Sequence, residues 1–75
     1  MSKILSAINT HGLVGEYIDE DIRLEVDGQY SGVFKPTGAV YEFWPISHGG
    51  IDITKLGRIR AALAKANKIR YREQA

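Results

Sequence analysis

The stretch IRLEVDGQYSGVFKPTGAVYEFWP, residues 22–45, decides the fold. Its first five residues alternate between apolar and charged side chains, which is the two-residue period of a strand with one buried face. Asp27-Gly28 then predicts a two-residue type I′ hairpin turn, because both central positions of that turn need a positive φ. We therefore predict antiparallel strands over about 21–27 and 29–35.

A second turn and a third strand complete the predicted sheet. The segment Pro36-Thr37-Gly38 carries residues that are typical of turns. The six residues AVYEFW at 39–44 include β-branched and aromatic side chains, and Pro45 ends this strand because it has no backbone donor for the ladder. The sheet is therefore predicted to be a three-stranded antiparallel meander.

Apolar residues at helical spacing lie on both sides of this meander. Ser2 can cap a helix over 2–11, and Asp52 or Thr54 can cap a long helix over 53–71. The predicted fold class is α+β, an α-β-β-β-α sandwich in which two helices pack on one face of the sheet. The predicted core comprises Ile4, Leu5, Ile8, Leu24, Val26, Val33, Phe43, Leu56, Ile59 and Leu63.

The composition bounds the class of protein. The chain has 75 residues, of which 44% are hydrophobic and 25% charged, as expected for one globular domain spanning 1–75. It has no cysteine, so it can form neither a disulfide framework nor a thiolate metal site. The apolar runs are too short for a bilayer, and the first residues do not resemble a secretory signal. We expect a cytoplasmic protein with no membrane partner.

The net charge of +1 conceals a segregation along the chain. Residues 16–27 contain six acids and one base, whereas residues 55–72 contain seven bases and no acid. A face with several Lys and Arg attracts polyanions, and an acidic face repels them. Each run is either a solvated face or the surface that meets a partner.

Three short motifs resemble the HicA family of small toxin ribonucleases, over about residues 3–67. Gly28-Gln29-Tyr30 stands where the family has Gly-Ser-His, and Pro45 with His48 resembles its Pro-His pair. Gly57-Arg58-Ile59, followed by residues 62–67, resembles the start and close of its last helix. The resemblance implies a fold related to the double-stranded-RNA-binding domain and an RNA-directed function, with the family's catalytic histidine replaced by Tyr30.

This replacement decides the expectation about catalysis. Activating a ribose 2′-hydroxyl needs a proton acceptor near neutral pH, and tyrosine, with a pKa near 10, is a poor base. His48 is the candidate for a relocated base, although a histidine in a Gly-rich loop more often belongs to a turn. We expect His11 to contact the end of the first helix or to be exposed. The aromatics Phe34, Phe43 and Trp44 are interpreted as core, with base stacking as the alternative.

Non-catalytic RNA binding is the first predicted function. The predicted nucleic-acid-binding residues are Lys55, Arg58, Arg60, Lys65, Lys68, Arg72, His48 and Tyr30. The alternative is a small phage or mobile-element protein that inhibits a host nucleic-acid machine, as anti-CRISPR proteins do. Its predicted partner-binding residues are Glu16, Asp19, Glu20, Asp21 and Glu25. Protein partners would be an antitoxin or a host nucleoprotein complex, and an active ribonuclease using His48 is a further alternative.

No metal or cofactor is predicted. Three consecutive acids at 19–21 project in different directions and lack the spaced turn glycine of a calcium loop. The glycine pair at 49–50 is not followed by the lysine and hydroxyl of a phosphate-binding loop.

Overall fold

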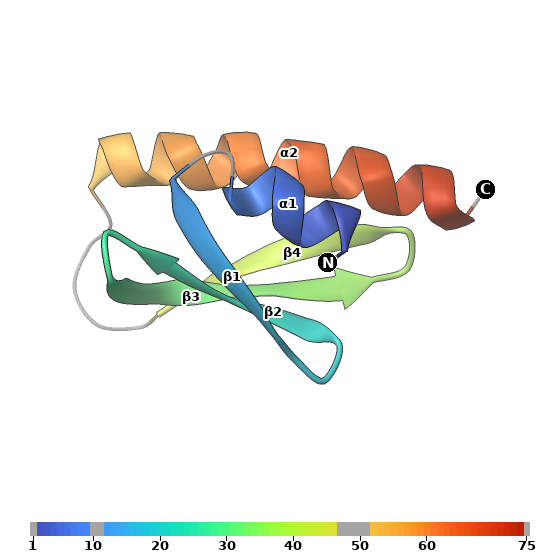
Figure 1. The fold of residues 1–75 in the computed structure, drawn as a ribbon, viewed down its shortest axis with the longest axis horizontal. Coiled ribbons are helices and arrows are strands. Elements are labelled where there is room, and N and C mark those ends of the chain that lie inside the picture. Colours follow the sequence, from blue (N-terminus) through green and yellow to red (C-terminus); the bar gives the residue numbers. More distant parts are fainter. Residues whose placement is uncertain (1, 10–11, 47–51, 75) are drawn as a thin grey trace.

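The computed structural model describes residues 2–9, 12–46 and 52–74, which form two helices and four strands in these ranges (Figure 1). Along the chain they are α1 (Lys3–Asn9), β1 (Leu13–Ile18), β2 (Asp21–Val26), β3 (Gln29–Thr37), β4 (Val40–Pro45) and α2 (Ile53–Gln74). The predicted α+β class and two helices are confirmed. The predicted number of strands is wrong, because the sheet has four strands rather than three.

The additional strand is β1, which forms a hairpin with β2. The strands are in the order β1-β2-β3-β4 and all neighbours are antiparallel. Ile18 pairs with Asp21 across the tight turn at Asp19-Glu20, in which Asp19 has a φ of 56°. Gly15 takes an inward position in the middle of β1, where a Cβ would lie 3.2 Å from side-chain atoms of Ile22 and Leu5. A glycine at this position removes the apolar side chain that would have shown the alternation of a strand.

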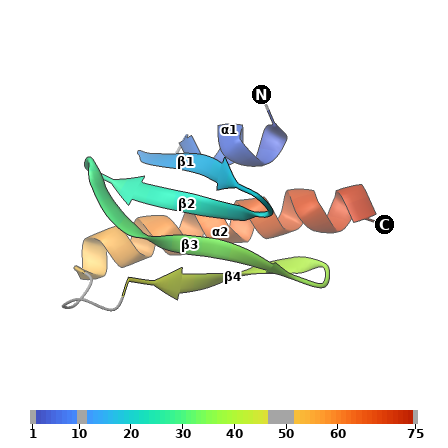
Figure 2. The same cartoon turned by 90° about the horizontal axis from the view of Figure 1, so that it is seen from below.

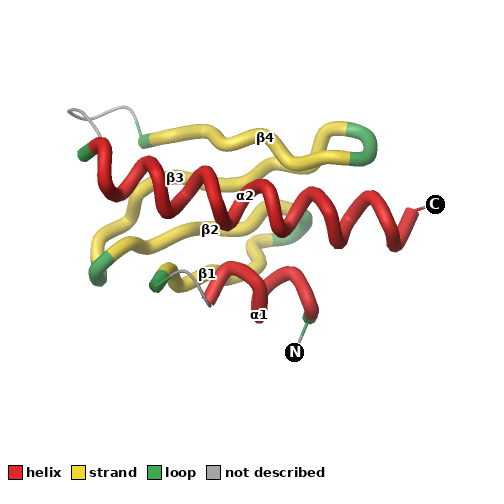
Figure 3. The backbone as a smooth tube through the Cα atoms, turned by 90° about the horizontal axis from the view of Figure 1, so that it is seen from above, coloured by secondary structure: helices red, strands yellow, loops and turns green. Residues whose placement is uncertain are grey.

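Both helices lie on one face of the sheet, side by side (Figures 1 and 3). α1 contacts β1, and α2 contacts β4. Seen from the other side, the strands lie in front of α2 (Figure 2). The molecule therefore has two layers, and no described element covers the second face of the sheet.

A β-bulge in β3 decides which of its side chains enter the core. Val26 pairs with Gln29 and Glu25 with Tyr30, but Leu24 pairs with Gly32, so Ser31 is an extra residue on β3. Without the bulge, Val33 would lie opposite Ile22 and point inward, as predicted. With it, Phe34 pairs with Ile22 and is fully buried, while Val33 points to the other face. The assignment of Val33 to the core is therefore wrong.

The core lies between the sheet and the helices. Its buried residues are Ile4, Ile8, Leu13, Ile22, Leu24, Val26, Phe34, Tyr41, Ile59, Ala62 and Ala66, against which Leu5, Phe43, Leu63 and Ile69 pack. On α2 the buried line runs through Ile59, Ala62 and Ala66. At 3.6 residues per turn Leu56 lies to one side of this line, and it is exposed, contrary to prediction. Trp44 is also exposed, because it alternates with inward-facing Phe43.

The predicted caps and the first predicted turn are confirmed. Ser2 Oγ accepts a hydrogen bond from the Leu5 amide at 3.0 Å, and Asp52 Oδ1 accepts one from the Thr54 amide at 2.7 Å. The hydrogen bond from the Thr54 amide is the largest cause of a lowered pKa of Asp52, and the Lys55 amide is the next. Asp27 and Gly28 both have positive φ values, 54° and 80°, as a type I′ turn requires.

Pro36 lies within β3, which continues to Thr37, so the predicted end of this strand was too early. The last pair between β2 and β3 is Ile22 with Phe34. Pro36 lies beyond it, so its missing N–H removes no hydrogen bond from that ladder. The following turn contains Gly38, with a φ of 63°.

Candidate functional site

The charge segregation along the sequence becomes a segregation between the two layers. Apart from Glu73, all charged residues of α2 are bases, and Arg60, Lys65, Lys68 and Arg72 are exposed on it. Lys65, Lys68 and Arg72 follow one another at i, i+3 and i+7, which places them along one side of the helix. We call the four residues the helix basic surface. It lies in the helical layer, whereas most of the acids lie on the strands of the sheet and the turns that join them.

The other two predicted bases of α2 are engaged with the turn between β2 and β3. Arg58 Nη2 forms an ion pair with Asp27 Oδ2 at 3.0 Å, and its Nε is buried with no hydrogen-bond partner among the described residues. Lys55 Nζ lies 3.4 Å from Gln29 Oε1. Arg58 and Lys55 therefore join α2 to the sheet.

The second face of the sheet, which we call the outer face, presents alternate residues of all four strands. Its residues are Val14, Glu16, Ile18, Asp21, Arg23, Glu25, Tyr30, Val33, Lys35, Thr37, Val40, Glu42 and Trp44. Tyr30 is on this face, so the structure does not bring it together with the helix basic surface. The guanidinium of Arg23 instead lies over the Tyr30 ring, with its Cζ atom 4.7 Å from the ring centroid.

The predicted acidic residues divide between this face and one turn. Asp21 lies 3.6 Å from Lys35 Nζ, and Glu25 lies 2.8 Å from Arg23 Nη1, so both are in ion pairs. Glu16, Asp19 and Glu20 are exposed, and none of them is in an ion pair with a described residue. They form the exposed acidic end of the β1–β2 hairpin.

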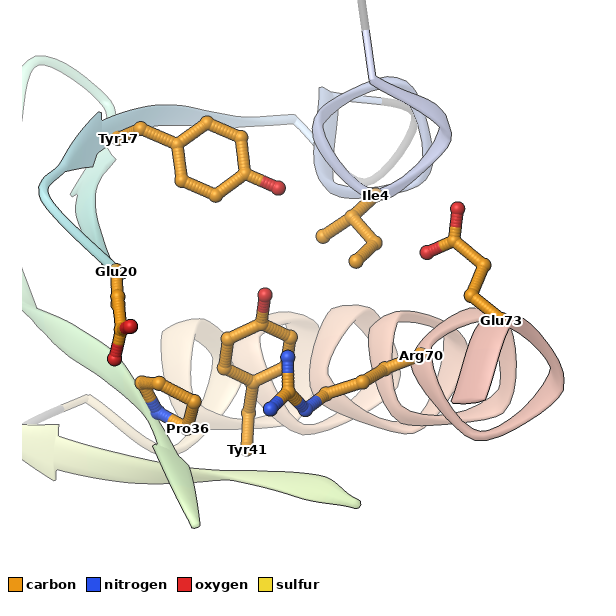
Figure 4. Close-up of a pocket in the computed structure, with 7 residues that line it drawn as sticks. All are labelled: Ile4, Tyr17, Glu20, Pro36, Tyr41, Arg70 and Glu73. Atoms are coloured by element: carbon orange, nitrogen blue, oxygen red, sulfur yellow. The ribbon is translucent and has the colours of Figure 1, made fainter. Parts of the chain in front are cut away.

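A pocket of roughly 320 Å³ opens between the sheet and the ends of both helices (Figure 4). Its lining residues come from both helices, three strands and one turn: Ile4, Tyr17, Glu20, Pro36, Tyr41, Arg70 and Glu73. Arg70 lies over the Tyr41 ring, 5.0 Å from its centroid, and donates to the Gly38 carbonyl from Nη2 at 2.9 Å. Sequence reasoning missed this pocket, because its residues are far apart in the chain and belong to no motif.

The environment of Tyr41 determines what this pocket offers chemically. Burial raises the pKa of Tyr41, the neighbouring Tyr17 raises it further, and Arg70 opposes the shift. The Tyr41 hydroxyl therefore stays protonated at neutral pH and can donate a hydrogen bond. The hydroxyls of Tyr17 and Tyr41 both point into the pocket, between the carboxylates of Glu20 and Glu73 (Figure 4). The arrangement suits hydrogen bonding to a small polar group rather than proton abstraction.

Both histidines of the chain, His11 and His48, lie outside the described residues, and so do the roles predicted for them. Within residues 2–9, 12–46 and 52–74, no three His, Cys, Asp or Glu side chains form a group that could hold a metal ion. No described helix is both long enough and apolar enough to cross a membrane.

Comparisons with known proteins leave the geometry as the main guide to function. No protein-family model, curated protein or solved structure matches the chain.

Proposed function

We propose that this protein binds nucleic acid without cleaving it, through the helix basic surface. The observation that carries the proposal is the exposure of Arg60, Lys65, Lys68 and Arg72 on a helix whose only acid is Glu73. Phosphates are the dominant source of affinity for such a surface, and they carry no sequence information. RNA is the expected nucleic acid, since the resemblance to HicA-type toxins implies RNA.

The layer geometry favours contacts to phosphates over base stacking. The exposed aromatics Tyr30 and Trp44 lie on the outer face, away from α2. A strand of RNA on the helix basic surface would therefore not reach these rings. We expect binding that depends strongly on salt and weakly on sequence.

Two double variants with the same change of net charge test this proposal. Lys65→Gln with Lys68→Gln removes two of the four charges of the helix basic surface, and Arg23→Gln with Lys35→Gln removes the two positive charges of the outer face. Binding of structured RNA, duplex DNA and single strands is measured by fluorescence anisotropy at several salt concentrations. Each phosphate contact contributes about 0.9 to the slope of log K against log salt for a duplex.

The α2 double variant should bind every nucleic acid more weakly and flatten the slope by about 2, whereas the outer-face variant should stay close to wild type. Equal losses in both variants would show that only net charge matters. Absence of binding at low salt would refute the proposal.

The exposed end of the β1–β2 hairpin supports a second candidate function. Glu16, Asp19 and Glu20 project from one hairpin and could imitate phosphates in the basic groove of a host nucleic-acid machine. Changing Asp19→Asn together with Glu20→Gln should then abolish capture of a nucleic-acid-binding protein, and nucleic acid should compete with the wild type for that protein. A partner that is retained by the double variant would exclude this mimicry.

A further inference from the structure

The outer face is unusually apolar for a sheet surface that no described element covers. An antiparallel sheet with one face packed on a core normally presents polar residues on the other. Here six of the thirteen outward positions are apolar or aromatic: Val14, Ile18, Tyr30, Val33, Val40 and Trp44. Trp44 is 54% exposed and Val14 59% exposed. Exposed apolar groups gathered on one face indicate an interaction surface.

The charges of the outer face are mainly negative. Its two cations are engaged within the chain: Arg23 pairs with Glu25 and lies over Tyr30, and Lys35 pairs with Asp21 and lies 5.6 Å from the centroid of the Trp44 ring. Glu16 is exposed on β1, and Glu42 accepts a 3.4 Å hydrogen bond from Trp44 Nε1. With four carboxylates against two cations, this face attracts positive groups and repels phosphates.

We propose that the outer face binds a protein segment in which apolar side chains are flanked by Lys or Arg. The apolar side chains would cover Val33 in the middle of β3 and its paired neighbour Trp44 near the end of β4. The basic side chains would reach the carboxylates of Glu16 on one side and Glu42 on the other. This inference goes beyond nucleic-acid binding by α2 and does not depend on it.

The size of the outer face argues for a short segment rather than a second copy of the chain. Four strands of about six residues span roughly 400 Å², at about 4.8 Å between strands and 3.3 Å per residue. A stable interface between two proteins buries about 800 Å² on each partner. Two copies would also bring two acidic faces together. A single-stranded nucleic acid is disfavoured for the same electrostatic reason, although Tyr30 and Trp44 could stack on bases.

Trp44 is the only tryptophan in the chain, so its emission reports directly on this face. Purified protein is titrated with three twelve-residue peptides that alternate Val with Lys, Val with Glu, or Ser with Lys, and with oligouridine. We expect a saturable change in Trp44 emission with the Val–Lys peptide alone. Equal responses to the Val–Glu or the Ser–Lys peptide, or no response to any peptide, would overturn the proposal.

Variants locate the binding on the outer face. Glu16→Gln combined with Glu42→Gln should raise the Kd of the Val–Lys peptide roughly 3- to 10-fold, since each exposed pair contributes a fraction of a kcal/mol. Glu73→Gln, which removes a carboxylate from α2, is the charge control and should change the Kd less than 2-fold. Val33→Thr, which keeps the shape of the side chain, should also weaken binding at an unchanged melting temperature. Oligouridine binding that shifts Trp44 emission and is strengthened by Glu16→Gln would assign the face to nucleic acid instead.

This test and that of the α2 surface can fail separately. The Lys65→Gln, Lys68→Gln variant should bind RNA more weakly. Its Trp44 emission should still respond to the Val–Lys peptide as in the wild type, because the two faces act independently. Loss of the peptide response in that variant would contradict the placement of the site on the outer face.

Discussion

The carboxamide of Asn67 on α2 binds both backbone polar groups of Tyr41 on the edge strand β4. Asn67 Oδ1 accepts a hydrogen bond from the Tyr41 amide at 2.6 Å, and Nδ2 donates to the Tyr41 carbonyl at 3.4 Å. Because β4 is an edge strand of the sheet, these backbone groups would otherwise be open to another strand. Asn67 thus joins the helix to the sheet and protects the β4 edge.

Asn67→Ala should destabilise the fold by about 1–3 kcal/mol, because the two hydrogen bonds are lost and the β4 edge is opened. The amide of Tyr41 should exchange with solvent faster than in the wild type, as measured by hydrogen exchange. Lys68→Ala, at the next position on α2 and exposed, is the control and should leave this exchange rate unchanged. An unchanged Tyr41 amide in Asn67→Ala would contradict the assigned role.

The β-bulge at Ser31 predicts opposite effects at two adjacent residues. Phe34→Ala should cost about 3–5 kcal/mol because Phe34 is fully buried, which would unfold most of a domain of this size. Val33→Ala should cost less than about 1 kcal/mol, since Val33 lies on the outer face. Chemical denaturation measures both values. A reversed order would mean that β3 has no bulge and that Val33 and Phe34 are exchanged between the two faces of the sheet.

Gly32 is expected to tolerate no side chain. A Cβ at this position would lie 2.5 Å from the Trp44 carbonyl oxygen and 2.7 Å from the Phe43 ring, and its φ is 143°. Gly32→Ala should therefore cost about 2–5 kcal/mol. The same substitution at Gly57, where a Cβ meets no atom within 4 Å, should stabilise the helix by about 0.5–1 kcal/mol. Melting temperatures that move in the same direction would refute this comparison.

The raised pKa of Tyr41 predicts a loss of stability at alkaline pH. The folded protein holds this proton more tightly than the unfolded chain, whose tyrosine has a pKa of 10.0. The stabilisation is therefore complete below about pH 10 and is lost as the pH rises through the higher folded value. Tyr41→Phe should have a flatter dependence of melting temperature on pH in this range. Tyr71→Phe, at an exposed position, should retain the wild-type dependence.

We expect no ribonuclease activity above background, because Tyr30 is a poor base and lies on the layer opposite the helix basic surface. The assay is cleavage of a long labelled RNA by the wild type and by the His48→Ala and Tyr30→His variants. Tyr30→His should not create activity, since RNA on α2 would not reach it. Cleavage by the wild type that His48→Ala removes would identify an active toxin with a relocated base.

Local signals in the sequence were sufficient for most individual elements. The alternation at residues 22–26, the Asp27-Gly28 turn and the caps at Ser2 and Asp52 depend on side chains a few residues apart, so the sequence determined them. The opposite charges of residues 16–27 and 55–72 were also visible. β1 was not predicted, because its central inward residue is Gly15, which packs under α1 and leaves no apolar alternation to detect.

The tertiary structure alone decided which residues share a surface. One extra residue in β3 moved Phe34 inward and Val33 outward, since a shift by one position reverses every side chain of a strand. The layer arrangement separated Tyr30 and Trp44 from the bases of α2 and placed Arg70 beside Tyr41, which is 29 residues away in sequence. These juxtapositions depend on how distant segments pack, because the contacts that hold them have no counterpart in the order of neighbouring residues.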